Sequence, residues 1–196
     1  MEDIQIYLLL TDTSSLLTQT IKLFTRQKYN HISIAFDNEL ENTYSFGRRK
    51  ISNPFIGGFV KEDTGSNFFL RSDCAIYSLT ITQNEKVKLD ELIYKMEADK
   101  QIWHYNFLGL ITAFFEINWD RENHYFCSQF VATVLSEAGI FKTNKPLSLI
   151  SPMDILESLS CKLEYEGTLF DYSQDQSLSQ LLHYPSSTKL KKKNFS

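Results

Sequence analysis

The sequence predicts one α+β domain in which an antiparallel sheet packs against helices. The first observation is the order of the elements: a helical pattern near the front, extended segments in the middle and helical patterns again behind. The second is that residues 31–36 and 43–47 are extended and flank a polar connection, as in a β-hairpin. The third is a length of 196 residues with 42% hydrophobic and 14% aromatic residues, enough for one sizeable core.

The front of the chain predicts a strand followed by a helix. Residues 4–10 form a continuous apolar run, typical of a largely buried strand. The Thr11-Asp12-Thr13-Ser14 segment then supplies N-cap residues, and apolar residues recur at helical spacing behind it. A helix is therefore expected over about 14–27.

The predicted hairpin has two chemically different faces. His31, Ser33 and Ala35 point to one side, because successive strand residues alternate. Tyr44 and Phe46 of the second strand are expected to join the aliphatic core on the opposite side. Small residues then remain beside His31, which leaves room for another element to approach.

The rest of the chain is interpreted from turn residues and periodicity. Asn53-Pro54 and Gly57-Gly58 mark residues 51–66 as a loop. Gly139 ends one helix, and Ser151-Pro152 begins a short one. After the loop, strands are expected at 68–70 and 74–81, and helices at 88–99, 104–117 and 126–138. The short helix that begins at Ser151-Pro152 is expected to end at Leu159, and a last strand is expected at 162–170. The folded domain is expected over residues 1–172 and a flexible polar, basic tail over 173–196.

Composition excludes several classes of function. A net charge of −4 gives no electrostatic reason to expect nucleic acid as a partner. The lysine cluster at 189–193 reads as a solvated end, with a membrane or nucleic-acid tether as the alternative. The apolar start is too short to span a bilayer and is preceded by Glu2 and Asp3, so no signal peptide or transmembrane segment is expected. Three cysteines without CxxC spacing indicate reduced thiols and a cytoplasmic protein.

Cys127 is the leading candidate for chemistry. It stands at the predicted start of the 126–138 helix, where the helix dipole favours the nucleophilic thiolate. The alternative is a small core residue, since Cys127 shares the apolar stripe of that helix with Phe130 and Val131. A structural cysteine has no reason to prefer the dipole end.

His31 is the candidate base. The small residues beside it leave space for a helix N-terminus that delivers Cys127. Ser45, on the small-residue face of the neighbouring strand, is positioned to hydrogen-bond the imidazole nitrogen remote from the thiol. Serine is a weak orienting residue, because it brings no charge to stabilise imidazolium.

Other reactive side chains have simpler explanations. Cys74 and Cys161 are expected to pack in the core, His104 to pack or lie at the surface, and His183 to lie in the exposed tail. His124, three residues before Cys127, is the rival base. No HxxxH, HExxH or paired CxxC pattern indicates a metal, no phosphate-binding glycine loop is present, and no GxSxG motif indicates a serine hydrolase. Neither a metal nor a cofactor is expected.

Two segments resemble those of the permuted papain-like cysteine amidases, bacterial relatives of NlpC-type cell-wall amidases and of lecithin:retinol acyltransferase. His31-Ile32-Ser33-Ile34 is similar to the histidine strand of that family, and Phe126-Cys127-Ser128-Gln129-Phe130-Val131 to its nucleophile motif. Ser151-Pro152 before a short helix is also similar. In this family the histidine precedes the cysteine, as here. The resemblance covers roughly residues 4–170 and implies a permuted papain-like (NlpC-type) fold.

The resemblance implies a role for each candidate. Cys127 would be the nucleophile and His31 the general base and later acid. The third polar position falls on Ser45, where the family more usually carries an acidic, amide or imidazole side chain; Glu62 is a possible substitute if the 51–66 loop folds back. Tyr105 is a candidate oxyanion donor beside the Cys127 backbone N–H.

Three functions are weighed. The first is a cysteine hydrolase that cleaves an amide or ester through an acyl-enzyme on Cys127. The second is a non-catalytic or weakly active binding module of the same fold, favoured by Ser45 as a weak orienting residue. The third is an acyltransferase with an acceptor other than water. Expected substrates are peptide-like, amino-acid-amide or lipid-like small molecules, and the oligomeric state is not determined.

Overall fold

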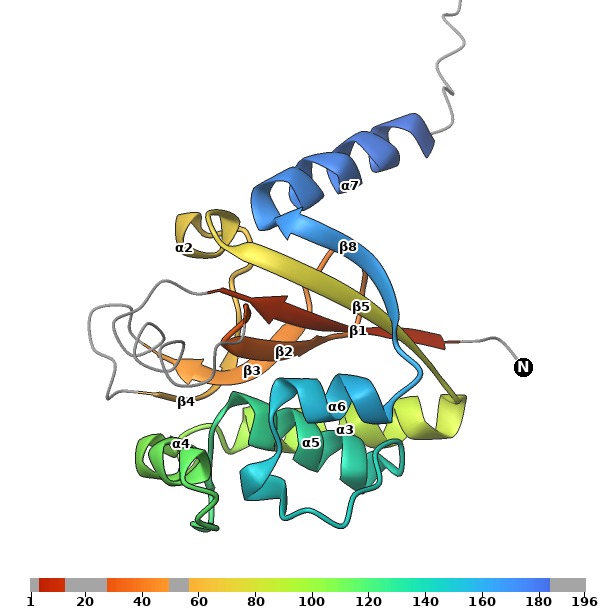
Figure 1. Cartoon of the computed structure of the whole chain (residues 1–196). Coiled ribbons are helices and arrows are strands. Elements are labelled where there is room, and N and C mark those ends of the chain that lie inside the picture. The colour runs from red at the N-terminus through yellow and green to blue at the C-terminus, as the bar shows by residue number, and fades with distance from the viewer. Residues whose placement is uncertain (1–3, 13–27, 50–56, 184–196) are drawn as a thin grey trace, which may run out of the picture.

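A six-stranded sheet is the main element of the computed structural model, which describes residues 4–12, 28–49 and 57–183 (Figure 1). The strands lie in the order β4-β3-β2-β1-β5-β8, and all neighbouring pairs are antiparallel. They are β1 (Ile4–Thr11), β2 (His31–Ala35), β3 (Thr43–Arg48), β4 (Gly57–Lys61), β5 (Asp73–Ile81) and β8 (Lys162–Thr168). The predicted α+β class with an antiparallel sheet is confirmed.

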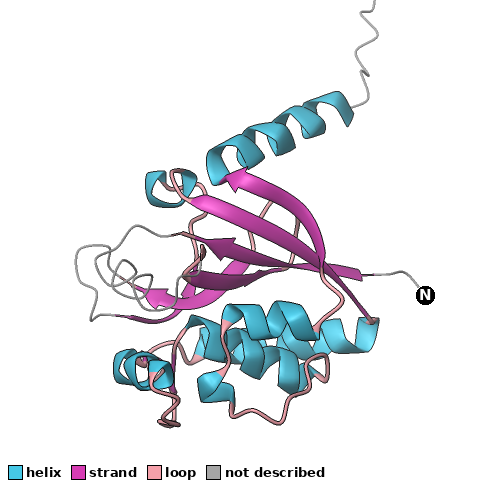
Figure 2. Cartoon of the chain, in the orientation of Figure 1, coloured by secondary structure: helices cyan, strands magenta, loops and turns pink. Residues whose placement is uncertain are grey.

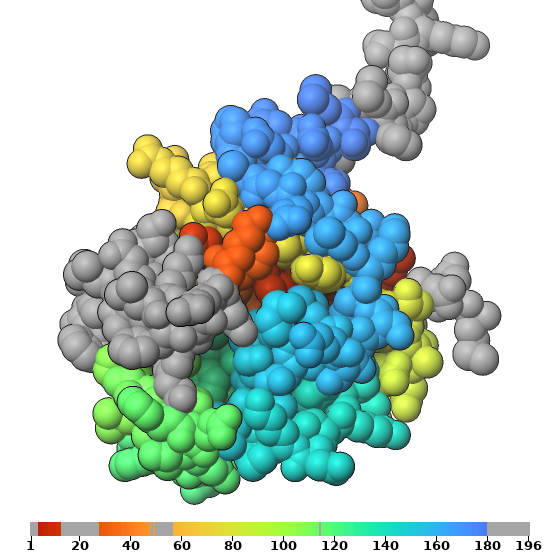
Figure 3. All heavy atoms as spheres, in the orientation of Figure 1, coloured from red at the N-terminus to blue at the C-terminus, as the bar shows by residue number. Residues whose placement is uncertain are grey.

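Helices lie on both sides of this sheet (Figures 1 and 2). The larger group, α3, α5 and α6, lies along one face, and α2 and α7 lie on the other side, next to β5 and β8. In the space-filling view the blue atoms of the α7 region lie at the upper end of the molecule, away from the green atoms of the α4 region at the lower end (Figure 3). The helices are α2 (Asn67–Leu70), α3 (Gln83–Ala98), α4 (Phe107–Phe114), α5 (Cys127–Ala138), the 3-10 helix η1 (Leu147–Leu149), α6 (Pro152–Ser158) and α7 (Leu169–His183).

Strand alternation divides the core between the two faces. Leu8 and Leu10 of β1 belong to the main cluster, which also contains the apolar stripe of α5. Leu9, between them, belongs to a smaller cluster with Ala35 and Tyr172 of α7. Tyr44 and Phe46 join the main cluster, as predicted for the hairpin. Since β1 pairs with both β2 and β5, it forms the centre of the sheet.

A second, two-stranded sheet lies before α5. It pairs β6 (His104–Tyr105) with β7 (His124–Tyr125) in parallel. Residues 104–117 were expected to be helical throughout, but the helix in this stretch is α4 alone, and β6 precedes it. β6 is adjacent to β4, so this small sheet lies next to one edge of the large one.

Several predicted boundaries are confirmed. Gly139 ends α5 with a left-handed φ of 89°. Ser151 caps α6 through a reciprocal capping box with Asp154, and Pro152 occupies the first turn. The strands expected at 4–10, 74–81 and 162–170 correspond to β1, β5 and β8.

Two extended or irregular segments were predicted wrongly. Residues 68–70 were expected to be a strand but lie in α2, because a short apolar run does not distinguish the two states. Residues 57–61, expected in a loop, form β4. A Cβ at Gly57 would lie 2.8 Å from the Gly47 carbonyl oxygen, and one at Gly58 would clash with the Trp103 carbonyl. The two glycines therefore allow close backbone approach within a strand.

Part of the segment predicted as a flexible C-terminal tail is helical. Residues 173–183, expected in the polar tail, belong to α7. The helix is held by buried Tyr172, whose hydroxyl donates to the Asn38 carbonyl at 2.6 Å. The helix expected at 14–27, residues 51–56 of the expected loop and the lysine cluster at 189–193 lie outside the described residues. None of the helices in the described part of the chain combines the length and apolar character needed to span a membrane.

Candidate active site

Cys127 is the first residue of α5. The preceding Phe126 is extended, with φ −109° and ψ 172°, and provides no side-chain cap. The first-turn backbone N–H groups therefore point toward the region in front of the helix without a capping oxygen from that residue. The Phe130 ring contacts Phe46 of β3 with a centroid distance of 5.2 Å, which seats α5 on the sheet. The cysteine is 6% exposed.

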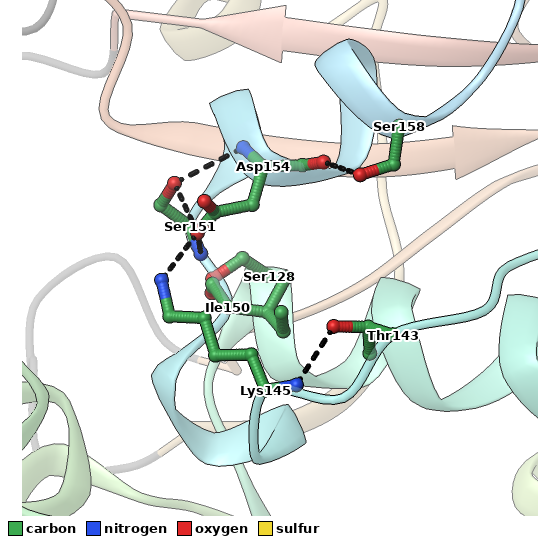
Figure 4. A network of polar contacts seen from close by, with 7 residues as sticks. All are labelled: Ser128, Thr143, Lys145, Ile150, Ser151, Asp154 and Ser158. Atoms are coloured by element: carbon green, nitrogen blue, oxygen red, sulfur yellow. Dashed lines mark hydrogen bonds and ion pairs between the residues drawn. The ribbon is translucent and has the colours of Figure 1, made fainter.

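A polar network holds the first turn of α5 against the segment before α6 (Figure 4). Ser128 donates to the Ile150 carbonyl at 2.7 Å. Ser151, the next residue, caps α6, and Asp154 of that helix accepts an ion pair from Lys145 at 2.8 Å. The Ser151-Pro152 segment singled out in the sequence thus supports the position of the Cys127 helix.

His31 lies where β2 and β3 separate. The ladder between these strands pairs Ile34 with Tyr44 and Ala35 with Thr43, and it ends before His31. At this splayed end the side chain of Cys127 hydrogen-bonds to His31, and its sulfur is also hydrogen-bonded by the Ile32 backbone. The two residues that the sequence paired across 96 positions are therefore brought together.

Glu62 is the third member of the arrangement. It follows β4 directly, and its backbone N–H donates to the Thr43 carbonyl at 2.8 Å. His31 Nε2 donates to Glu62 Oε1 at 2.7 Å, and the Glu62 side chain is only 4% exposed. With Nε2 engaged in this way, Nδ1 is the ring nitrogen left to face Cys127.

Ser45 is linked to His31 through Glu62, whereas a direct hydrogen bond to the imidazole was predicted. Its hydroxyl donates to Glu62 Oε1, whereas Ser33 donates to the other carboxylate oxygen at 2.7 Å. The predicted orienting position next to the imidazole is thus occupied by Glu62, the alternative that the sequence offered. Ser33 was not predicted as a site residue, because its small side chain was expected only to leave space. Its place on the same strand face as His31 was the signal that could have found it.

The direction from which α5 approaches was also predicted wrongly. The small residues of β2 and β3 were expected to make room for the Cys127 helix. Instead, α5 packs on the aliphatic face, with Ile32, Ile34 and Phe46. The small side chains leave volume for the Glu62 carboxylate, and Cys127 reaches His31 at the open end of the hairpin.

The electrostatics favour an ionised pair. Burial alone lowers the pKa of His31, but the charge of Glu62 and the hydrogen bonds to Cys127 and Glu62 outweigh it and raise the pKa to about 10. Burial raises the pKa of the Cys127 thiol, yet its hydrogen bond to His31, the charge of His31 and the Ile32 and Ser128 backbone bring the pKa below its usual value. The direction of both shifts favours the thiolate of Cys127 and the imidazolium of His31.

Glu62 stays ionised in spite of its burial. Desolvation raises the pKa of its carboxyl group, but the His31 charge and the hydrogen bonds from His31, Ser45 and Ser33 together bring the pKa below its ordinary value. The thiol, imidazole and carboxyl groups therefore form one hydrogen-bonded chain in which each shift favours the charged form.

The remaining candidates lie in other settings. Tyr105 is on β6, in contact with Gly57 and in register with Tyr125, two positions before Cys127. His124 donates from Nδ1 to the Glu122 carbonyl at 2.7 Å. Its ring lies beside His104, with ring centroids 5.1 Å apart.

The two other cysteines are ordinary buried or half-buried thiols. Burial raises the pKa of Cys74 to about 12 and that of Cys161 to about 11. Neither is poised as a nucleophile at neutral pH. The contrast with Cys127 shows that burial by itself does not activate a thiol in this fold.

A groove of about 400 Å³ lies on the α7 side of Glu62. Asp63, Leu169, Tyr172 and Gln176 are among the residues that line it, together with Glu62 itself. Neither Cys127 nor His31 lines this groove. Glu62 therefore belongs both to the lining of this groove and to the hydrogen-bonded chain with His31.

Comparisons of this chain with protein-family models, with curated proteins and with solved structures found no match.

Proposed function

We propose that this protein is a cysteine hydrolase that cleaves an amide or ester bond through an acyl-enzyme on Cys127. One observation carries the proposal: His31 is hydrogen-bonded at once to a cysteine at a helix N-terminus and to a buried carboxylate. Nucleophile, base and orienting residue in hydrogen-bond contact are the arrangement that nucleophilic acyl transfer requires.

The chemistry follows from the protonation states. The Cys127 thiolate attacks the substrate carbonyl carbon, and a tetrahedral oxyanion forms. The His31 imidazolium gives its proton to the departing amine or alkoxide as the carbon–heteroatom bond breaks, which leaves a thioester and a neutral imidazole. His31 then removes a proton from water, hydroxide adds to the thioester, and the acid and Cys127 thiolate are released.

Glu62 stabilises the charged form of His31 and fixes its ring. The carboxylate accepts from Nε2, so Nδ1 faces the thiol and the leaving group. Ser33 and Ser45 hold the carboxylate in turn. The binding-module alternative depended on Ser45 as a weak orienting residue; a charged Glu62 in contact with His31 favours the enzyme instead.

The oxyanion would be stabilised by backbone N–H groups at the start of α5. The dipole of this 12-residue helix also favours negative charge there. Such donors contribute about 3 kcal/mol each in other acyl-transfer sites. Tyr105 remains the proposed side-chain donor, since the pairing of β6 with β7 brings its backbone close to the strand that enters α5.

We further propose that the domain is a permuted papain-like amidase domain. The support is the order of a histidine strand before a cysteine helix, and the packing of that helix on an antiparallel sheet. The substrate class is a peptide-like amide, an amino-acid amide or a lipid-like ester. An acyltransferase would use the same acyl-enzyme and differ only in the acceptor.

The test is selective alkylation followed by trapping of the acyl-enzyme. We expect iodoacetamide at mildly acidic pH to modify Cys127 in preference to Cys74 and Cys161, because only the Cys127 pKa is lowered. Mass spectrometry of the peptides gives the site. In a separate, unalkylated sample, incubation with a p-nitrophenyl ester should give a burst of p-nitrophenol and a Cys127-linked acyl group.

The matched controls use the chain's own thiols. Cys127→Ser should abolish the burst and the low-pH labelling, whereas Cys161→Ser should preserve both. Labelling of Cys127 only at alkaline pH, or a burst that survives in Cys127→Ser, would refute the proposed nucleophile. Added amine acceptors would separate transfer from hydrolysis through the products formed.

A further inference from the structure

The two-stranded sheet before α5 places two histidines side by side. His104 of β6 is in direct register with His124 of β7, and their ring centroids are 5.1 Å apart at an interplanar angle of 44°. The next pair along the strands, Tyr105 and Tyr125, packs against the main core. Because side chains alternate along a strand, the imidazoles lie on the opposite, outer face. His104 is exposed and His124 is half-buried.

Backbone hydrogen bonds fix this spacing. The His104 N–H donates to the Asn123 carbonyl and the Asn106 N–H to the Tyr125 carbonyl, both at 2.8 Å. The His124 N–H donates to the Arg121 carbonyl at 3.1 Å. The two Cα positions are therefore set by the ladder and its flanking turn, and only the imidazole torsions remain to be adjusted.

The tautomer of one imidazole already suits a metal ligand. His124 Nδ1 lies 2.7 Å from the Glu122 carbonyl oxygen, which can only accept, so Nδ1 carries the proton. In the neutral ring, Nε2 then carries the free lone pair. Donation of the other ring N–H to a carbonyl is the usual support of a metal-bound histidine, since it fixes the tautomer and raises the basicity of the ligand atom.

We propose that His104 and His124 bind a divalent transition metal ion of the Zn²⁺ type. Imidazole nitrogens suit such ions. With metal–nitrogen distances of about 2.0–2.1 Å, two tetrahedral imidazole ligands have ring centroids about 5 Å apart, and the 5.1 Å separation of this pair allows that arrangement once the imidazole torsions adjust. No group of three or more His, Cys, Asp or Glu side chains able to hold a metal occurs within residues 4–12, 28–49 and 57–183. The site therefore has two protein ligands, and water completes the coordination.

The ion would join β6 to the strand that leads into α5. His124 stands three positions before Cys127, so the metal fixes the entry to the helix without touching the thiol. Binding to the folded state alone stabilises it by mass action. This site stands independently of the proposed hydrolase activity.

The test is a Zn²⁺ titration of chelator-treated protein by isothermal calorimetry, with the melting temperature as a second readout. It is run in wild type and in Cys127→Ser, which removes the competing thiolate. We expect one Zn²⁺ per chain and a melting temperature that rises with Zn²⁺. His104→Ala and His124→Ala should each weaken binding by at least about tenfold and remove the rise in melting temperature.

His183→Ala, which changes the chain's fourth histidine, is the control and should bind Zn²⁺ as wild type does. Equal Zn²⁺ affinity in His104→Ala and wild type would overturn the proposal, as would loss of binding only in Cys127→Ser. If His124→Ala fails to fold, His104→Ala decides, because its ring is exposed. Saturation only at millimolar Zn²⁺ would mean an adventitious surface contact and would equally overturn it.

Discussion

At the scale of single residues, the charge on Glu62 distinguishes Cys127 from the other two thiols. All three are at least half-buried, and burial raises the pKa of Cys74 to about 12 and of Cys161 to about 11. Cys127 is the exception because its partner His31 is held as a cation by the carboxylate. The lowered pKa of the Cys127 thiol thus depends on a carboxylate that lies two side chains away from the sulfur.

Glu62→Gln tests this dependence. The amide keeps the shape but removes the charge that raises the pKa of His31, so the His31 pKa should fall and the Cys127 pKa should rise. We expect the rate of the ester burst at neutral pH to fall by on the order of 10²- to 10⁴-fold. The rate of Cys127 alkylation as a function of pH measures the thiol pKa directly.

Ser45→Ala is the matched comparison for Glu62→Gln. It removes one hydrogen bond to Glu62 and leaves the carboxylate charge in place. Its effect on the Cys127 pKa should have the same sign and be much smaller. Equal effects of the two variants would show that ordering of the network, and not charge, controls the thiol.

At the scale of elements, β4 decides where Glu62 lies. The strand was predicted as a loop because Gly57-Gly58 reads as a turn signal. In the structure the two glycines allow β4 to pack closely against β3 and β6. Glu62 emerges directly from the end of this strand, so any shift of β4 moves the carboxylate.

Gly58→Ala tests the role of β4. A methyl group there would clash with the Trp103 carbonyl and lie 2.8 Å from Arg49 Nη2. We expect the free energy of unfolding to fall by about 1–3 kcal/mol and the activity to fall with it.

Gly65→Ala is the control. A Cβ at this position, three residues beyond Glu62, meets only Asp63 Oδ1 at 3.6 Å, an ordinary contact. Urea denaturation should show Gly65→Ala unchanged or slightly more stable; equal destabilisation by both changes would argue against close packing of β4.

The capping box of α6 gives a second test at this scale. Ser151→Ala removes the cap next to the Ser128–Ile150 contact, and Thr82→Ala removes the equivalent box of α3. Each substitution should lower the free energy of unfolding by about 1 kcal/mol. Only Ser151→Ala should also slow Cys127 alkylation, because its box adjoins the first turn of the cysteine helix. Slowing by Thr82→Ala to the same extent would show a global effect instead.

At the scale of the whole molecule, the buried pair of His31 and Glu62 makes the free energy of unfolding depend on pH. The Glu62 pKa lies below its ordinary value of 4.5, so its contribution is present above pH 4.5 and lost as pH falls through the folded-state pKa. The His31 pKa is raised from 6.5 to about 10, so its contribution is full below pH 6.5 and lost as pH rises toward 10. Both contributions coincide between pH 4.5 and 6.5.

The stability difference between wild type and Glu62→Gln should therefore be largest between pH 4.5 and 6.5. It should shrink toward strongly acidic pH and again toward pH 10. Urea denaturation at a series of pH values measures it. A stability difference that stays constant from strongly acidic pH to pH 10 would mean that His31 and Glu62 are not coupled in the folded protein.

The sequence by itself determined the pattern-based parts of this protein. Alternation and helical periodicity predicted the β2–β3 hairpin, the sheet class and the Cys127 helix with its Gly139 end, because these depend on neighbours in the chain. The pairing of Cys127 with His31 was also predicted, from a helix N-terminus and a resemblance.

Only the tertiary structure decided between Ser45 and Glu62 as the partner of His31. That choice depends on how β4 packs. Two adjacent glycines, Gly57 and Gly58, are typical of a turn, and nothing in the local sequence shows that here they allow close backbone approach within a strand. The same holds for His104 and His124, which lie 20 positions apart and meet only through the β6–β7 ladder. Side chains from distant segments acquire their chemistry from packing, which no local pattern records.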